Sequence, residues 1–416
     1  MKQLITSCIL ACMLSTCLAQ TSILVSGKVI DGDTKKPINY ATISIQDESI
    51  GTITNADGTF ELSLASEFKD DTVIISHLGF QPIKWIAEEL QQQTIILEAS
   101  PVELDEITVR TDRVNGMQIF REAFDRLQDN FSQEPHQMMA FFRQASLEGD
   151  QYVLLVEAAR DIYDEKYKLQ KKFNLKENIV VRQVRSSNNY FQYKNLNFFD
   201  GANPIKLLLN WNYTRYENAY AMARKDYQLD SVIYSNDQLV YVISSSYADS
   251  KLENRFTLHI DAETYAFVKI KNENKAKGEE VLGVSPLLAD RSKLVGMTRS
   301  SQEYTFRTYD GKVYLQNCLS SNTATIIEKK SGRVERIVSD ENLLVISEII
   351  TDGIKMPKAK IMDPNSNIKD QASQYDTSFW KDFQQVRLVP LTTKQKADLE
   401  RETPLQKQFL KNSEAP

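Results

Sequence analysis

Residues 54–64 read TNADGTFELSL, and this stretch contains the turn and the strand that decide the fold of the first part of the chain. Asp57-Gly58 is a tight-turn dipeptide, because glycine adopts a positive φ without a Cβ clash. Phe60 and the two leucines after it alternate with polar residues, which is typical of a strand with one buried face. The segment from Gly51 to Leu64 is therefore predicted to form a β-hairpin.

Short strand-like segments separated by turns continue on both sides of this stretch, from Ile23 to about Glu98. Apolar and polar residues alternate between Ala41 and Gln46, and residues 73–75 form a continuous apolar run. Strands this short, at this spacing, are typical of a small β-sandwich. We expect an all-β domain over residues 22–99.

Three blocks of this region, residues 26–45, 51–64 and 73–82, together resemble the carboxypeptidase-regulatory-like domain. The resemblance implies a transthyretin-like sandwich of about seven strands in an envelope protein of the Bacteroidota. The matching positions are expected to be structural: Gly27, Asp31, Pro37, Ala41, Asp57, Gly58, Phe60, Gly79 and Phe80.

The domain name does not imply a peptidase. A zinc carboxypeptidase requires an H-x-x-E pair and a later histidine, whose nitrogen and oxygen atoms converge on an open tetrahedral site. None of the three histidines of the chain, His77, His136 and His259, has a glutamate three residues later. We expect no zinc carboxypeptidase activity.

Residues 1–19 are typical of a secretory signal peptide, with Lys2 before an uncharged apolar run from Leu4 to Leu18. Cleavage after Ala19 is the first interpretation, and a lipid anchor on Cys17 is the alternative. Either predicts an exported protein, in the periplasm or associated with the outer membrane. The only cysteine beyond this leader is Cys318, so we expect no internal disulfide.

The formal net charge is −6, which argues against nucleic-acid binding. No later apolar run approaches the roughly 20 residues of a transmembrane helix. The expected partners are an envelope protein, a glycan or a lipid.

The larger remainder is predicted to be an α+β domain over residues 117–390, after a linker at 100–116 and before a polar tail at 391–416. Apolar residues recur at helical spacing from Phe120 to Phe131, with Asn115 as an N-cap. Successive hairpins follow, of which the clearest turns at Asp310-Gly311. They predict a large antiparallel sheet. One hairpin, at 254–273, is similar to those of lipoprotein-carrier-type half-barrels with an apolar concave face.

No motif in this remainder indicates catalysis or a cofactor. His259, Asp261 and Glu263 share one face of an extended strand, which is a spacing that metals use, but the last two are expected to form a turn instead. We therefore predict no catalytic, cofactor or metal residues. Three functions stay open: a non-catalytic binding or scaffold protein, a carrier of lipid or another apolar ligand, and a hydrolase with an unrecognised site.

Overall fold

The computed structural model describes residues 22–100, 115–169, 178–192, 203–210, 212–215, 222, 225–235, 238–278, 280–287, 290–358, 361–366, 368–371, 375–382 and 388–413. The expected leader (1–19), with Cys17, and most of the expected linker (100–116) lie outside these residues.

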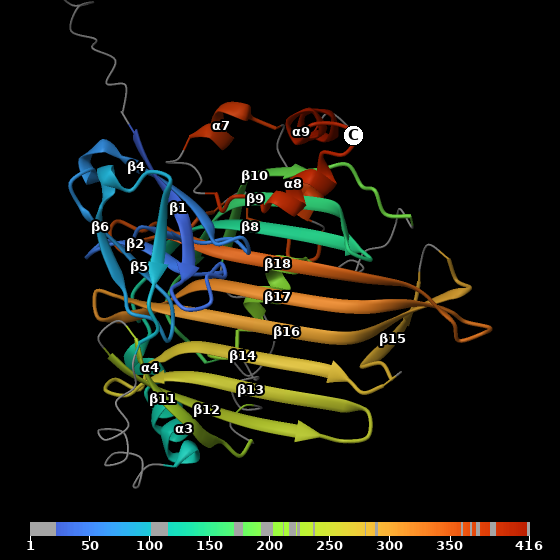
Figure 1. Ribbon diagram of the computed structural model, residues 1–416, viewed down its shortest axis with the longest axis horizontal. Coiled ribbons are helices and arrows are strands. Elements are labelled where there is room, and N and C mark those ends of the chain that lie inside the picture. Colours follow the sequence, from blue (N-terminus) through green and yellow to red (C-terminus); the bar gives the residue numbers. More distant parts are fainter. Residues whose placement is uncertain are drawn as a thin grey trace, which may run out of the picture.

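The first part of the chain is a sandwich of two small sheets (Figure 1). One has the strand order β4-β1-β7 and the other β3-β2-β5-β6. Their inward-facing side chains, among them Val29, Ile43 and Phe60, form one apolar core. The seven strands confirm the predicted sandwich: β1 (Ser22–Asp31), β2 (Thr42–Ile45), β3 (Gly51–Ile53), β4 (Thr59–Ala65), β5 (Thr72–Ser76), β6 (Ile83–Ile86) and β7 (Gln93–Leu97).

The predicted hairpin over Gly51–Leu64 is wrong in one respect. The turn is present, with Gly58 at φ +75°, but β3 pairs with β2 whereas β4 pairs with β1 in the opposite sheet. The side chain of Asn55 fixes this crossing, because its Oδ1 accepts from the backbone N–H groups of Asp57 and Thr59. The turn therefore links the two layers of the sandwich.

The other family-motif residues have local structural roles. Asp31 accepts hydrogen bonds from the backbone of the next turn, at Asp33 and Thr34. The remaining members lie in close backbone contacts, turns or the sandwich core and its margin: Gly27, Pro37, Ala41, Phe60, Gly79 and Phe80.

The rest of the chain is dominated by one open sheet of eleven strands, in the order β10-β9-β8-β18-β17-β16-β14-β13-β12-β11, with β15 paired to β16. All of its strand pairs are antiparallel, as predicted. The strands are β8 (His136–Glu148), β9 (Gln151–Asp164), β10 (Asn178–Ser186), β11 (Gln228–Ser235), β12 (Gln238–Ala248), β13 (Leu252–Asp261), β14 (Phe267–Ala276), β15 (Gly283–Pro286), β16 (Lys293–Tyr309), β17 (Lys312–Glu328) and β18 (Val334–Ile350).

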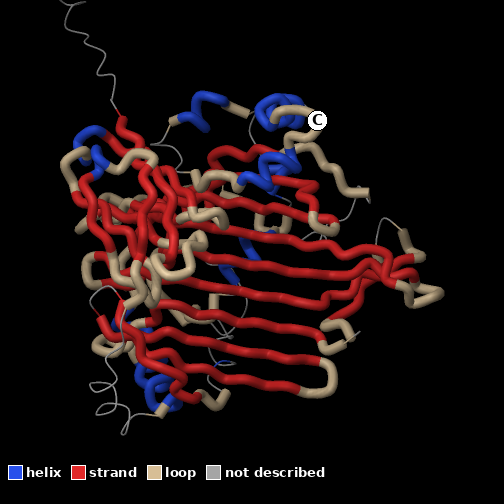
Figure 2. Tube along the Cα trace, in the orientation of Figure 1, coloured by secondary structure: helices blue, strands red, loops and turns tan. Residues whose placement is uncertain are grey.

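Each face of this sheet packs against other elements over part of its area (Figure 1). The core face, which carries Leu258, Tyr304 and Leu344, packs against α3 (Gly116–Asp125), α4 (Leu127–Asn130) and α5 (Pro204–Asn210). Asn115 caps α3 as predicted, since its Oδ1 accepts from the Gln118 N–H at 2.8 Å. The opposite face, called the sandwich face, lies beneath the N-terminal sandwich, whose strands cross in front of the sheet in Figure 2.

The sandwich is attached to the large sheet by apolar and polar contacts. Ile53 is fully buried and packs in one cluster with Phe141 and Val345 of the sheet. Gln316 Nε2 donates to Thr42 Oγ1 at 2.8 Å. The two parts therefore share a buried interface on the sandwich face.

The stretch from 391 onward, expected to be a polar tail, forms α8 (Thr393–Leu399) and α9 (Leu405–Ser413) on the same face, beside α7 (Thr377–Lys381). The few apolar residues of this stretch are enough for packing, because the side chains of Leu399 and Phe409 are buried against the sheet. A short 3₁₀ helix lies at Ile368–Gln371, and two more lie in the sandwich at Ser66–Phe68 and Ala87–Glu89.

Candidate functional site

A stripe of uncharged polar side chains and one aspartate crosses the core face of the large sheet. It consists of two rows that follow the strand register. One row is Asn254, Asn274, Ser300, Asn322, Asp340 and Ser146. The other is Asn272, Gln302, Ser320, Asn342 and Gln144.

This stripe is buried. Nine of its eleven members have at most 9% of their surface exposed, and Asp340 is fully buried; Asn274 and Gln302 are half-buried. Along each strand it borders the apolar core, since Ile270, Tyr304 and Leu344 occupy the next positions on the same face. A polar stripe of this kind is costly to bury without partners.

At the β13–β16 end, the stripe satisfies itself. Asn254 Nδ2 donates to Asn272 Oδ1 at 2.7 Å and to Asn274 Oδ1 at 2.9 Å. Asn272 Nδ2 in turn donates to the Tyr213 hydroxyl at 2.7 Å, which donates to Gln302 Oε1 at 3.1 Å. Five side chains are thus linked in one hydrogen-bond network at this end of the stripe.

Asp340 organises the other end. Its Oδ1 accepts from Gln144 Nε2 at 3.0 Å and Ser146 Oγ at 2.8 Å, and its Oδ2 accepts from Asn342 Nδ2 at 2.7 Å. Burial raises the pKa of this carboxyl, and the three donors lower it by less. The balance favours the neutral acid more than in water.

Between the two ends, the stripe forms the floor of a cavity of about 610 Å³. This volume lies within the ~300–1,000 Å³ range of small-molecule sites. The floor consists of amides and hydroxyls, at Asn274, Ser300, Gln302, Ser320, Asn322 and Asn342. The walls are aliphatic: Pro204, Leu207 and Leu208 of α5, with Leu252, Val281, Leu282 and Met297.

Charge is almost absent from this cavity. Among the described lining residues, Lys251 alone is charged at neutral pH, and its side chain is 69% exposed, 4.0 Å from Glu280. Tyr304 also lines the cavity, but its hydroxyl donates to the Leu208 carbonyl at 2.9 Å. The lining residues that the structure describes therefore include no acid–base pair and no nucleophile beside a base.

A second, smaller cavity of about 350 Å³ lies on the sandwich face, where the N-terminal sandwich, the sheet and α8 meet. It is more polar and includes Glu303, Glu341 and Tyr152. The Tyr152 hydroxyl donates to Glu341 Oε2 at 3.1 Å, and Lys269 pairs with Glu303 at 2.7 Å. Each of the two glutamates in this cavity therefore already has a partner.

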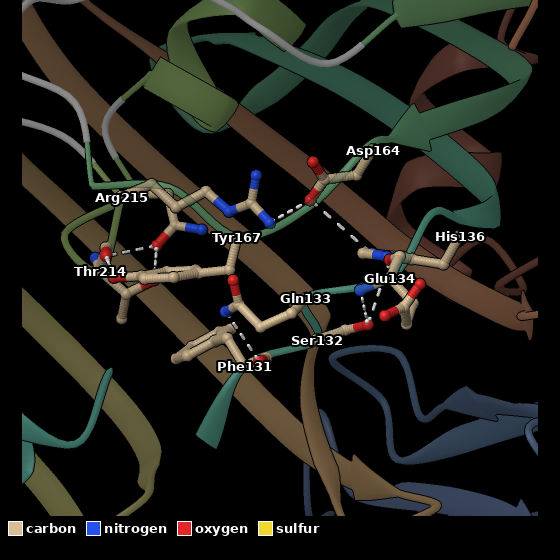
Figure 3. A network of polar contacts seen from close by, with 10 residues as sticks. Phe131, Ser132, Gln133, Glu134, His136, Asp164, Tyr167, Thr214 and Arg215 are labelled. Atoms are coloured by element: carbon tan, nitrogen blue, oxygen red, sulfur yellow. Dashed lines mark hydrogen bonds and ion pairs between the residues drawn. The ribbon is translucent and has the colours of Figure 1, made fainter. Parts of the chain in front are cut away.

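His136 and Asp164 form a histidine–carboxylate pair, an arrangement that many active sites use (Figure 3). Its Nε2 lies 3.7 Å from Asp164 Oδ2, and its Nδ1 contacts the Glu134 carbonyl at 3.1 Å. Asp164, however, also pairs with Arg215. Burial lowers the pKa of His136, and Asp164 offsets this only in part. The adjoining cavity is about 20 Å³, which is too small for a substrate.

His259, Asp261 and Glu263 do not converge on a common point. Asp261 Oδ1 accepts from the backbone of Glu263 and Thr264, which is the turn role expected from the sequence. Burial lowers the pKa of His259 to about 4. Within the described ranges, no group of three His, Cys, Asp or Glu side chains is placed to hold a metal ion.

Sequence reasoning missed the polar stripe, although its pattern is visible. Ser300 and Gln302, Ser320 and Asn322, and Asp340 and Asn342 occur at i and i+2 in three successive strands. Such alternation identifies one face of a strand but not what covers that face. From the sequence alone, a polar residue that faces a covered side of the sheet therefore looks the same as one that faces solvent.

Comparison with known proteins supports the domain assignment of the first part. The family model of the CarboxypepD_reg-like domain matches residues 25–109. No curated protein sequence matches the chain significantly. Over the described residues, no helix has the length and apolar character needed to span a membrane.

Two solved structures share weak overall similarity with this chain. A DUF1329 family protein from Desulfovibrio piger has a TM-score of 0.23 and 9% identity, over 57% of this chain and 93% of that protein. Lipovitellin has a TM-score of 0.28 and 9% identity, over 59% of this chain and 28% of lipovitellin. Similarity this low carries no argument about a ligand.

Proposed function

We propose that this chain is a non-catalytic, exported binding protein of the cell envelope that holds a small ligand in the 610 Å³ cavity on the core face of the large sheet. The observation that carries the proposal is the lining: aliphatic walls from α5, β16 and the segment before β15, above a floor of side-chain amides and hydroxyls. Such a combination of apolar area with a few polar groups is typical of ligand sites.

The envelope location rests on two supports. The leader-like residues 1–19 predict export. The CarboxypepD_reg-like domain matches residues 25–109, and the resemblance of the sequence blocks to that domain implies an envelope protein. The sandwich binds the face of the sheet opposite the cavity, so it can contact an envelope protein or glycan while the cavity is occupied. A pure scaffold would not need the cavity.

The enzyme alternative makes a different demand. It requires groups that can exchange protons or attack a substrate, and Lys251 is the only charged residue in the described lining of the large cavity. The purified protein is expected to release no C-terminal amino acids from peptides, with or without added zinc. Zinc-dependent release that disappears in His136→Ala or His259→Ala would refute the non-catalytic assignment.

The binding proposal is tested with N-phenyl-1-naphthylamine, an uncharged apolar dye whose fluorescence rises in an apolar site. We expect saturable binding to the full-length chain. Met297→Trp, which places an indole in the cavity wall, should weaken binding at least tenfold. Arg299→Trp is the matched control, because Arg299 lies on the same strand and is exposed.

Two results would contradict the proposal. One is the absence of saturable dye binding by the parent protein. The other is equal dye affinity of the Met297→Trp and Arg299→Trp variants, both with the parent's thermal midpoint.

A further inference from the structure

The floor of the large cavity has one buried acceptor that no described residue satisfies. Asn342 is 3% exposed and lines the cavity. Its Nδ2 is committed to Asp340, whereas its Oδ1 has no hydrogen-bond partner. A buried polar atom left in this state is unfavourable, so the floor is suited to a ligand that brings an O–H or N–H donor.

The same floor also has spare donors. Ser320 Oγ accepts from Asn322 Nδ2 at 3.2 Å, and Ser300 Oγ accepts from Gln302 Nε2 at 3.1 Å. Neither hydroxyl donates to another described residue, so each keeps its own hydrogen for a ligand acceptor.

These groups lie side by side. Ser320 pairs directly with Asn342 across β17 and β18, and directly paired residues have Cβ atoms about 4.5–5.5 Å apart. A donor and an acceptor at this spacing match a ligand hydroxyl, or two neighbouring hydroxyls, because a hydroxyl both donates and accepts.

An ionic head group does not fit this floor. An anion would be desolvated without a counter-charge, since Lys251 is at the exposed rim. Asp340 is not a lining residue, and both of its oxygens already accept hydrogen bonds within the stripe. A cation would therefore meet only neutral amides and hydroxyls.

The walls indicate the rest of the ligand. Leu207, Leu282 and Met297 are flexible aliphatic side chains, and within the part of the lining that the structure describes, Tyr304 is the only aromatic residue. A sugar ring is usually bound against flat aromatic faces, whereas an alkyl chain packs equally well on aliphatic walls. The lining therefore favours a chain.

We infer that the ligand is an uncharged amphiphile: a hydrocarbon chain along the aliphatic walls, with a hydroxyl-bearing neutral head, of the acylglycerol type, between Asn342 and Ser320. This inference deepens the proposed function and rests on it.

The experiment compares probes with the same twelve-carbon chain and different heads. 1-Monolauroylglycerol, dodecanoate and dodecyltrimethylammonium are each titrated, below their micellar concentrations at pH 8, against dye-loaded full-length protein. The neutral probe should displace the dye at concentrations at least tenfold lower than either ion.

Ser320→Ala should weaken the neutral probe about 2–10-fold, which corresponds to one neutral hydrogen bond, and its dye affinity is measured alongside so that displacement is compared at equal dye occupancy. Ser321→Ala is the matched control, because Ser321 is the next residue on β17 and lies on the sandwich face. It should change neither affinity.

Equal displacement by the three heads, or no effect of Ser320→Ala on the neutral probe, would overturn the inference. If the dye still binds the parent and Met297→Trp weakens that binding, the proposed function stands although the inferred ligand class is wrong. Absence of dye binding by the parent would instead remove the proposed function and the inference together.

Discussion

Arg143 holds the carboxylate of Glu157 through two nitrogens, with Nε at 2.7 Å and Nη2 at 2.5 Å from Oε1. The other oxygen of Glu157 accepts from Arg185, whose guanidinium lies over the ring of Trp380 at 4.1 Å. Arg143 also donates to the Val389 carbonyl at 2.6 Å. This one carboxylate therefore links three strands, β8, β9 and β10, to the C-terminal segment.

Glu157→Gln is expected to destabilise the protein by about 3–5 kcal/mol, because it leaves two guanidinium groups short of a buried counter-charge. Glu157 is fully buried. Chemical denaturation measures the effect. Glu122→Gln is the control, since its pair with Arg126 is exposed and should contribute less than about 1 kcal/mol.

The Glu157 effect should also depend on pH. Burial alone would raise the pKa of Glu157, but Arg185 and Arg143 outweigh burial and hold it below its usual value. A lowered folded-state pKa gives stability that is present above the unfolded value and is lost as pH falls through the folded value. The advantage of the parent over Glu157→Gln should shrink in acid; an advantage that grows in acid would contradict this.

Asp340→Asn should show the opposite pH dependence. Burial raises the pKa of Asp340, so its contribution to stability is full below the unfolded pKa and is lost as pH rises through the folded pKa. Asparagine mimics the neutral acid at every pH. The variant should therefore gain stability relative to the parent between pH 4 and pH 8, as measured by urea denaturation at each pH. A difference that is constant over this range would argue against a raised pKa.

Residues 22–99 are expected to fold alone as a sandwich, but Ile53 should matter only in the full chain. Ile53 packs against Phe141 and Val345 of the large sheet, whereas Ile43 lies in the sandwich core. In the full chain, Ile53→Ala should cost about 2–5 kcal/mol, and much less in the 22–99 fragment. Ile43→Ala is the control and should cost a similar amount in both.

Calorimetry of the four proteins and their parents checks this. A fragment without a cooperative transition would refute the domain boundary. An equal cost of Ile53→Ala in fragment and full chain would show that Ile53 does not depend on the large sheet.

Gly58→Ala should destabilise the sandwich more than Gly79→Ala. Both glycines have positive φ, +75° and +83°, so alanine is strained at each. At Gly58 an added Cβ would also lie 2.5 Å from the Val29 carbonyl oxygen, whereas at Gly79 nothing lies within 4 Å. Thermal midpoints of the two variants give the comparison, and equal midpoints would mean that the turn moves to accept the methyl group.

Local sequence patterns predicted the positions of the strands and helices better than they predicted which strands pair. Asn115, the Asp310-Gly311 turn and the sandwich strands other than β6 were readable because capping, turn chemistry and alternation act over a few residues. The expected number of about seven strands came from the resemblance to the carboxypeptidase-regulatory-like domain. The partner of β4 was not readable, because strand pairing depends on distant residues such as Val25, which pairs with Leu62. A turn motif specifies that the chain reverses direction. It does not determine which sheet the strand on either side of the turn joins.

The candidate site was missed for a related reason. Ser320, Asn322 and Asn342 are ordinary polar residues in alternating strands, and they become unusual only when α5 and the segment before β15 cover them. No catalytic or metal motif marks a neutral floor, since hydrogen bonding to uncharged groups needs no special residue type. Such sites become visible when burial and register are known.

The pairing of β8 with β18 has a consequence for the order in which the protein is made. Ser146 and Asp340, which face each other across this pair, are 194 residues apart in the chain. At typical synthesis rates, β8 emerges from the ribosome about 10–40 s before its neighbour exists. Until then its inner edge has unpaired backbone groups that can recruit another strand. The first hairpin of the large sheet is thus an aggregation hazard during biosynthesis, and a chaperone that holds it open would have a defined period in which to act.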